Sequence, residues 1–143
     1  MILPDVNVLV YAYRREADDH DRYRTWLTAV VAGKDELALH DLPLLGFARI
    51  VTNPRIMARP APLSAALAFV DRLRGAPRAR WLPTGDVPWD ALRGLATNDK
   101  ALGGNLLPDA HLAALAIAHG ARLATADRGF ARFPELDWFD PAA

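Results

Sequence analysis

Short apolar runs alternate with longer segments of helical periodicity along almost the whole chain. The runs that read as strands are residues 2–3, 36–39, 81–82, 122–125 and 138–139. Between them, apolar residues recur every three to four positions, as they do on one face of a helix. Strands that alternate with helices form a parallel sheet covered by helices. The sequence therefore predicts an α/β fold, a three-layer α/β/α sandwich around a central, mainly parallel sheet.

Capping residues, glycines and prolines set the expected ends of the helices. Three helices are expected at residues 8–14, 44–51 and 63–73. Another is capped by Asp18 or Asp19 and closed by Gly33. A fifth is capped by Asp86, and the last runs from Pro108 to Gly120. That last segment is apolar almost all round, which predicts a buried helix.

Length and composition limit the number of domains and the cellular compartment. With 143 residues, we expect a single domain over residues 1–143, because two halves would each have too little core. The absence of cysteine excludes disulfides and thiolate metal sites. The first residues lack the basic segment of a signal peptide. No apolar stretch approaches the length of about 18 residues that a membrane span needs. We therefore expect no membrane association and a cytoplasmic protein.

The charges give no global signal for nucleic acid, because 17 basic and 17 acidic residues balance. Lys34 and Lys100 are the only lysines, so nearly all the cations are arginines. Arginine binds phosphate and carboxylate bidentately, which suits either RNA or an acidic partner. A coding sequence rich in G and C explains the same bias without any function.

Three aspartates lie where a parallel sheet would bring them together. Asp5 and Asp127 each follow a predicted strand, and Asp109 opens the buried helix. Ligands bind outside the carboxyl ends of the strands in open α/β sheets. Carboxylates packed together repel one another, and a divalent cation such as Mg²⁺ or Mn²⁺ relieves that repulsion and can activate water.

Each acid also has a structural explanation. The helix dipole alone favours Asp109, and Asp127 can form an Asx-turn before Gly129. Asp5, amid apolar residues, needs a partner. The case for a site rests on the three acids together.

Other chemistries find little support. The single serine, Ser64, lies on a predicted helix without a nucleophile-elbow motif, and the histidines lack zinc spacing. An acidic phosphotransfer domain needs a late lysine, and none follows Lys100. The four tryptophans are expected in the core or at an interface.

Four segments together resemble a known family. Residues 5–12 read DVNVLVYA and resemble the opening of PIN-domain ribonucleases, in which the first catalytic Asp ends strand one. Residues 47–55 (FARIVTNPR) resemble a helix of the VapC toxins of type II toxin–antitoxin modules. The match resumes over residues 108–114 and 120–130.

The resemblance implies a Mg²⁺- or Mn²⁺-dependent endoribonuclease toxin that cuts structured RNA (tRNA or rRNA). It also implies a homodimer that is inhibited by a VapB-like antitoxin. By position, Asp5, Asp109 and Asp127 match catalytic, metal-binding acids of the family. Asn7 and Thr125 match polar residues that accompany them.

One position departs from the family pattern. Gly46 stands where the family usually has a second acid. The site therefore either holds one metal ion rather than two or recruits another acid. Asp41 is the first candidate for that role and Asp99 the second. Gly129 also replaces a frequent acid. The alternative is a catalytically degenerate PIN module that binds RNA or protein.

Overall fold

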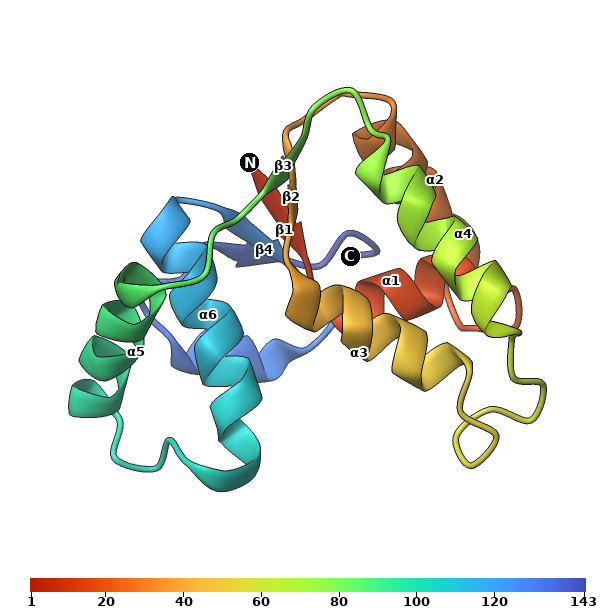
Figure 1. The fold of residues 1–143 in the computed structure, drawn as a ribbon. Coiled ribbons are helices and arrows are strands. Elements are labelled where there is room, and N and C mark those ends of the chain that lie inside the picture. The colour runs from red at the N-terminus through yellow and green to blue at the C-terminus, as the bar shows by residue number, and fades with distance from the viewer.

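A single sheet of five parallel strands lies at the centre of the computed structural model, which describes residues 1–143 (Figure 1). The strands are β1 (Ile2–Pro4), β2 (Leu37–Leu39), β3 (Ala79–Trp81), β4 (Arg122–Ala124) and β5 (Trp138–Phe139). Their order is β3-β2-β1-β4-β5, so β1 is the middle strand. Every neighbouring pair is parallel, and the sheet is therefore wholly rather than mainly parallel.

Six α-helices and two short 3₁₀ helices surround the sheet. They are α1 (Val6–Tyr13), α2 (His20–Val31), α3 (Asp41–Val51), α4 (Leu63–Arg74), α5 (Asp86–Asn98), α6 (Leu107–His119), η1 (Gly104–Leu106) and η2 (Arg128–Arg132). Figure 1 shows α5 and α6 on one side of the sheet and α1 to α4 on the other. Two apolar cores fill the two interfaces, which confirms the predicted three-layer sandwich. No helix has the length and apolar character needed to cross a membrane.

Two helices begin earlier than their apolar pattern predicted, because side chains cap them. α1 begins at Val6 rather than residue 8, since Asp5 Oδ1 accepts the Val6 N–H at 2.7 Å. α3 begins at Asp41 rather than residue 44, since His40 Nδ1 accepts the Leu42 N–H at 3.2 Å. Histidine is not among the favoured N-cap residues, so this cap could not be predicted from the residue pattern.

Other expected boundaries differ by one or two residues. Asp19 precedes α2 but forms no capping hydrogen bond, and its φ of 55° places it in the left-handed region. Asp86 is the first residue of α5 rather than its cap, which is Gly85. Gly120 ends α6 at φ 64°, as predicted, because glycine adopts this conformation without strain.

His40 is a buried titratable group in this fold. Burial, together with the charge of nearby His111, lowers the pKa of His40, and Asp41 opposes the shift only in part. Protonation of His40 also removes the lone pair that accepts the Leu42 N–H. A histidine with a lowered folded-state pKa stabilises the fold above its unfolded pKa of about 6.5, and this stability is lost as the pH falls.

We therefore predict that the contribution of His40 to the free energy of unfolding falls by about 1 kcal/mol between pH 8 and pH 5, while the raised carboxyl pKa values of Asp5 and Asp109 act in the opposite direction. His40→Asn keeps a capping acceptor without titrating, so it should flatten this dependence. Urea denaturation of both proteins across this pH range measures the difference. The pKa of His111 is also lowered by burial, so a part of the dependence remains in the variant. Equal slopes for the two proteins would contradict the prediction.

Candidate active site

Asp5 lies at the carboxyl end of the middle strand, between β1 and α1. Only 8% of its surface is exposed. Its Oδ1 accepts the Val6 N–H, and its Oδ2 accepts the hydroxyl of Thr125 at 2.7 Å. The backbone N–H of Asp5 donates to the Ala124 carbonyl at 2.9 Å. Both oxygens of this buried carboxylate are thus hydrogen-bonded, as burial of a polar group requires.

Thr125 connects the first aspartate to the last. Its side chain is fully buried, directly after β4. Its Oγ1 donates to Asp5 and accepts the backbone N–H of Asp127 at 3.0 Å. The same oxygen accepts the side-chain amide of Asn7 at 3.3 Å. A hydroxyl has one donor and two acceptor positions, so all three are used here.

Asn7 joins α1 to the segment that follows β4. Its Oδ1 accepts the Ala126 N–H at 3.2 Å, while its Nδ2 donates to Thr125. The amide therefore holds residues 125–126 against the first turn of α1. This bonding explains why a polar residue stands among the apolar residues of the segment.

Asp127 and Asp109 are more accessible than Asp5. Asp127 is exposed, and its Oδ1 accepts the Gly129 N–H at 2.7 Å, so it forms the Asx-turn that the sequence suggested and caps η2. Asp109 is half-buried in the first turn of α6. Asp127 and Asp109 therefore both have the structural roles that the sequence suggested. These roles do not explain why the two carboxylates lie near the carboxylate of Asp5.

The three carboxylates lie close enough to affect one another electrostatically. Burial is the main cause that raises the pKa of Asp5, and the charges of Asp109 and Asp127 raise it further, against the hydrogen bonds from Thr125 and Val6. Burial and the charge of Asp127 also raise the pKa of Asp109. Folding thus gathers three groups that repel one another when ionised.

This donor set fits an oxygen-preferring divalent cation in its chemistry. Carboxylate oxygens are the ligands of Mg²⁺ and Mn²⁺, and a cation would relieve the repulsion that raises these pKa values. The side chains as they lie do not form a ready coordination shell, since no three His, Asp or Glu groups are close enough to hold an ion together.

Gly46 lies at a tight contact between α3 and α1. A Cβ atom built at Gly46 would come within 2.9 Å of Val6 Cγ2, a distance that real side chains do not tolerate. An acid at this position would displace Val6, the residue after Asp5. The sequence could show that the acid is missing, but not that a neighbouring side chain occupies its place.

Neither of the two candidate replacement acids joins the three aspartates. Asp41 is exposed in the first turn of α3. Asp99 pairs with Arg132 at 3.0 Å, and hydrogen bonds from Ala101 and Arg132 lower the pKa of its carboxyl. Only Asp109 and Asp127 contribute charge repulsion to the raised pKa of Asp5.

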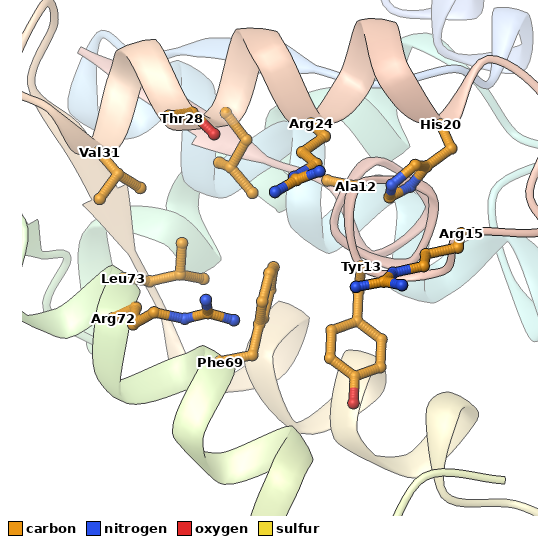
Figure 2. A pocket seen from close by; sticks show the side chains of 11 residues that line it. Ala12, Tyr13, Arg15, His20, Arg24, Thr28, Val31, Phe69, Arg72 and Leu73 are labelled. Atoms are coloured by element: carbon orange, nitrogen blue, oxygen red, sulfur yellow. The ribbon is translucent and has the colours of Figure 1, made fainter.

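A groove lies between α2 and α4, at the end of α1 away from Asp5. We call it the α2–α4 groove; its volume is about 500 Å³. Its apolar lining includes Leu27, Val31, Phe69 and Leu73, and its cationic lining is Arg15, Arg24 and Arg72. Figure 2 shows the guanidinium groups of Arg24 and Arg72 reaching into the space between the two helices. Sequence analysis did not detect this groove, because its walls come from distant segments.

A parallel α/β sandwich with acidic side chains gathered at the carboxyl edge of its sheet defines the class of this protein. The PIN domain model matches residues 2–136, and the chain belongs to the PIN domain family. It is 44% identical to the VapC ribonuclease Mb2897 of Mycobacterium bovis and to ribonuclease VapC43 of Mycobacterium tuberculosis, over 99% of this chain and 95% of each relative. Ribonuclease VapC33 of Mycobacterium tuberculosis is 36% identical, over 99% of this chain and 98% of the relative.

Solved structures share the fold at low sequence identity. VapBC2 from Rickettsia felis, bound to a DNA fragment from its promoter, matches with a TM-score of 0.68 and 21% identity, over 98% of both chains. FitAB bound to an IR36 DNA fragment matches with a TM-score of 0.70 and 19% identity, over 100% of this chain and 96% of the other.

The hydroxyl of Thr125 should contribute to stability through its three hydrogen bonds. Thr125→Val keeps the shape but leaves Asp5 Oδ2 and the Asp127 N–H without a partner, at a cost of about 1–3 kcal/mol. Thr125→Ser restores the hydroxyl and should recover most of the loss. Chemical denaturation in metal-free buffer measures both.

Thr97→Val is the matched control for this prediction. The Thr97 hydroxyl is exposed and donates to the Arg93 carbonyl within α5, so its loss should change stability by less than about 0.5 kcal/mol. A Thr125→Val protein as stable as Thr97→Val would show that the hydroxyl does not hold Asp5 in place.

Proposed function

We propose that this protein is a metal-dependent endoribonuclease, the toxin of a toxin–antitoxin module. The observation that carries the proposal is the gathering of Asp5, Asp109 and Asp127 at one edge of the sheet, in a chain whose relatives are named ribonucleases. A site of three repelling acids destabilises the fold unless a cation binds there. Such a cost is typical of functional sites rather than of structural ones.

Asp5, Asp109 and Asp127 would hold the metal ion, Mg²⁺ or Mn²⁺. When bound, such an ion supplies an activated water and neutralises charge on a phosphodiester. The chain itself positions the acids. Thr125 fixes the rotamer of Asp5, Asn7 holds the segment that carries Asp127, and the first turn of α6 presents Asp109.

The substrate in this proposal is a structured RNA such as tRNA or rRNA. Exposed arginines that no ion pair occupies, among them Arg49 and Arg128, would bind backbone phosphates. RNA binding should therefore weaken as the salt concentration rises. We further propose that residues 1–143 form one domain, and that the protein is a homodimer in the cytoplasm.

Gly46 favours the alternative of a degenerate module that binds RNA or protein without cutting. A side chain at this position would have to displace Val6, and Asp109 and Asp127 are the acids whose charges raise the pKa of Asp5, so the site has three carboxylates. Three acids still suffice to bind one divalent ion, because Mg²⁺ commonly keeps several waters and takes few protein ligands. Catalysis by one ion is therefore our first proposal.

The α2–α4 groove is the surface that we propose for a VapB-like antitoxin. Its apolar floor suits one face of an amphipathic helix, and its three arginines suit acidic residues on the rim of that helix. The name of the solved neighbour VapBC2 indicates a toxin bound to a partner chain. The groove lies outside the acid cluster, so binding and catalysis can be tested separately.

We predict that Asp5→Asn and Asp109→Asn each lower RNA cleavage by about 100-fold or more, since each removes a ligand of an ion that supplies several kcal/mol. The assay is cleavage of total RNA by purified, antitoxin-free protein in Mg²⁺, in Mn²⁺ and in EDTA. Asp41→Asn is the matched control, because it neutralises an exposed acid outside the cluster. Cleavage that survives both variants and EDTA would refute the site. RNA binding without cleavage in either metal would support the degenerate module.

For the groove, we predict that Arg72→Glu weakens binding of the cognate antitoxin by about 10- to 100-fold, the cost of placing like charges together at an interface. Arg74→Glu is the control, because Arg74 lies on the same helix, pairs with Asp71 and does not line the groove. Calorimetric titration of each variant gives the affinities. RNA cleavage by both variants should equal that of the unmodified protein. Equal antitoxin affinities for the two variants would place the partner elsewhere.

A further inference from the structure

One ion pair joins the two segments that carry Asp109 and Asp127. Arg132 donates from both Nε and Nη2 to Asp99 Oδ2, at 3.1 and 3.0 Å. The side chains of this pair are only 32% and 30% exposed, whereas each of the other five ion pairs has a partner that is more than half exposed. Water and salt screen a half-buried pair less than a fully exposed one. This pair can therefore hold two parts of the fold together, where fully exposed pairs contribute little.

Arg132 belongs to the segment that carries Asp127. It is the last residue of η2, and Asp127 caps the first turn of the same helix through the Gly129 N–H. The helix has five residues, and a 3₁₀ helix rises about 2 Å per residue, so Arg132 lies about 10 Å from Asp127 along the chain. Between them, Phe130 is buried in the core that also contains residues of α5 and α6. A shift of Arg132 is thus passed to Asp127 over a short, packed segment.

Asp99 belongs to the pair of helices that carries Asp109. It is the residue after α5, and α5 packs on α6 with a short connection between them (Figure 1). Its second oxygen, Oδ1, accepts the Ala101 N–H at 3.0 Å, so Asp99 also closes the first turn of that connection. Neighbouring helices joined by a short loop run antiparallel, so the end of α5 lies beside the start of α6, where Asp109 is. The ion pair therefore crosslinks the helix pair of Asp109 to the segment of Asp127.

The acids themselves push these two segments apart. Asp109 and Asp127 lie close enough to repel one another when both are ionised. The connection from α5 to α6 offers little resistance, because residues 100–105 are exposed except for the partly buried Leu102. One ion can bind both carboxylates only while their segments stay together. An attraction between the segments therefore favours binding of the ion.

We propose that Asp99 and Arg132 are a positioning pair for the metal site, whose attraction holds α6 and η2 together against the repulsion between Asp109 and Asp127. This inference rests on the proposed metal-dependent function and adds two residues to it. Neither residue is a ligand of the ion or a contact of the RNA. Loss of the pair should therefore weaken metal binding and leave RNA binding in EDTA unchanged.

The test is the affinity of the purified protein for Mn²⁺, measured by calorimetric titration without RNA. Asp99→Asn removes the charge but can still accept the Ala101 N–H, and Arg132→Gln removes the charge of the other partner. We expect each variant to raise the Kd for Mn²⁺ by about 10-fold, the lower end of what is typical for residues that orient metal ligands. The double variant should lose no more than either single variant, because the same pair is broken once. Arg132→Lys keeps the charge and should recover part of the affinity.

RNA cleavage gives a second measure of the same defect. The three acids are intact in Asp99→Asn, so its cleavage of RNA should be slow at low Mn²⁺ and recover at saturating Mn²⁺. Binding of labelled RNA, measured by fluorescence anisotropy in EDTA, should be the same for Asp99→Asn, Arg132→Gln and the unmodified protein.

Asp137→Asn is the matched control. Asp137 pairs with Arg122 Nε at 3.0 Å, so this variant also removes one negative charge and one ion pair. Arg122 begins β4 and Asp137 precedes β5, so the pair lies at the edge of the sheet opposite to the acids. The control should keep the Mn²⁺ affinity of the unmodified protein. Circular dichroism in metal-free buffer should show both variants folded, so that a difference in affinity reports on the site.

The outcomes that contradict the inference can be told apart. If the unmodified protein neither binds Mn²⁺ nor cuts RNA with it, the proposed function fails and the inference fails with it. If the unmodified protein does both and Asp99→Asn keeps its Kd for Mn²⁺, only the positioning role fails. Equal losses of Mn²⁺ affinity in Asp99→Asn and Asp137→Asn would assign the effect to overall charge. Weaker RNA binding by Arg132→Gln in EDTA would make Arg132 a phosphate contact instead.

Discussion

The buried carboxylate of Asp5 determines how the centre of the sheet is assembled. It stands at the end of the middle strand, where both neighbouring strands restrict its position, and an ionised group there loses most of its hydration. Two short hydrogen bonds compensate for this loss, one from Val6 and one from Thr125. The second requires β4 to lie beside β1 with Thr125 directly after its end. The same arrangement places Asp127 at the edge, so the pairing of two strands determines both the fold and the site.

The sequence was sufficient for the layers of the fold and for the convergence of the acids. Both follow from local patterns, since apolar runs that alternate with helical segments allow few arrangements, and residues after parallel strands share one edge. The first residues of α1 and α3 were predicted two and three positions too late, respectively. In both helices the capping side chain, Asp5 or His40, comes from the end of a strand. Apolar periodicity does not detect a turn that begins with polar or exposed residues.

Features that depend on distant contacts were not predictable from one sequence. From the sequence, Gly46 could be identified only as a position at which an expected acid is missing. The structure shows that a side chain at this position would collide with Val6. Thr125 and Asn7 were noted only by resemblance, and their bonds link positions about 120 residues apart in the chain. Trp89 was expected in the core or at an interface, and its exposure depends on how α5 packs on α6. Each of these depends on the distance between elements, which periodicity does not report.

The chain has no net charge, but acidic and basic side chains gather at opposite ends of α1. Asp5 caps its first turn among the repelling acids, and Ala12 and Tyr13 at its last turn line the cationic α2–α4 groove. The helix has eight residues, so the two features are separated by about 12 Å. An acidic partner in the groove is therefore attracted there and repelled by the acids at the other end. To inhibit the site, such a partner needs a further segment that runs along α1 and brings a cation to the three carboxylates, in the place where the metal ion would bind.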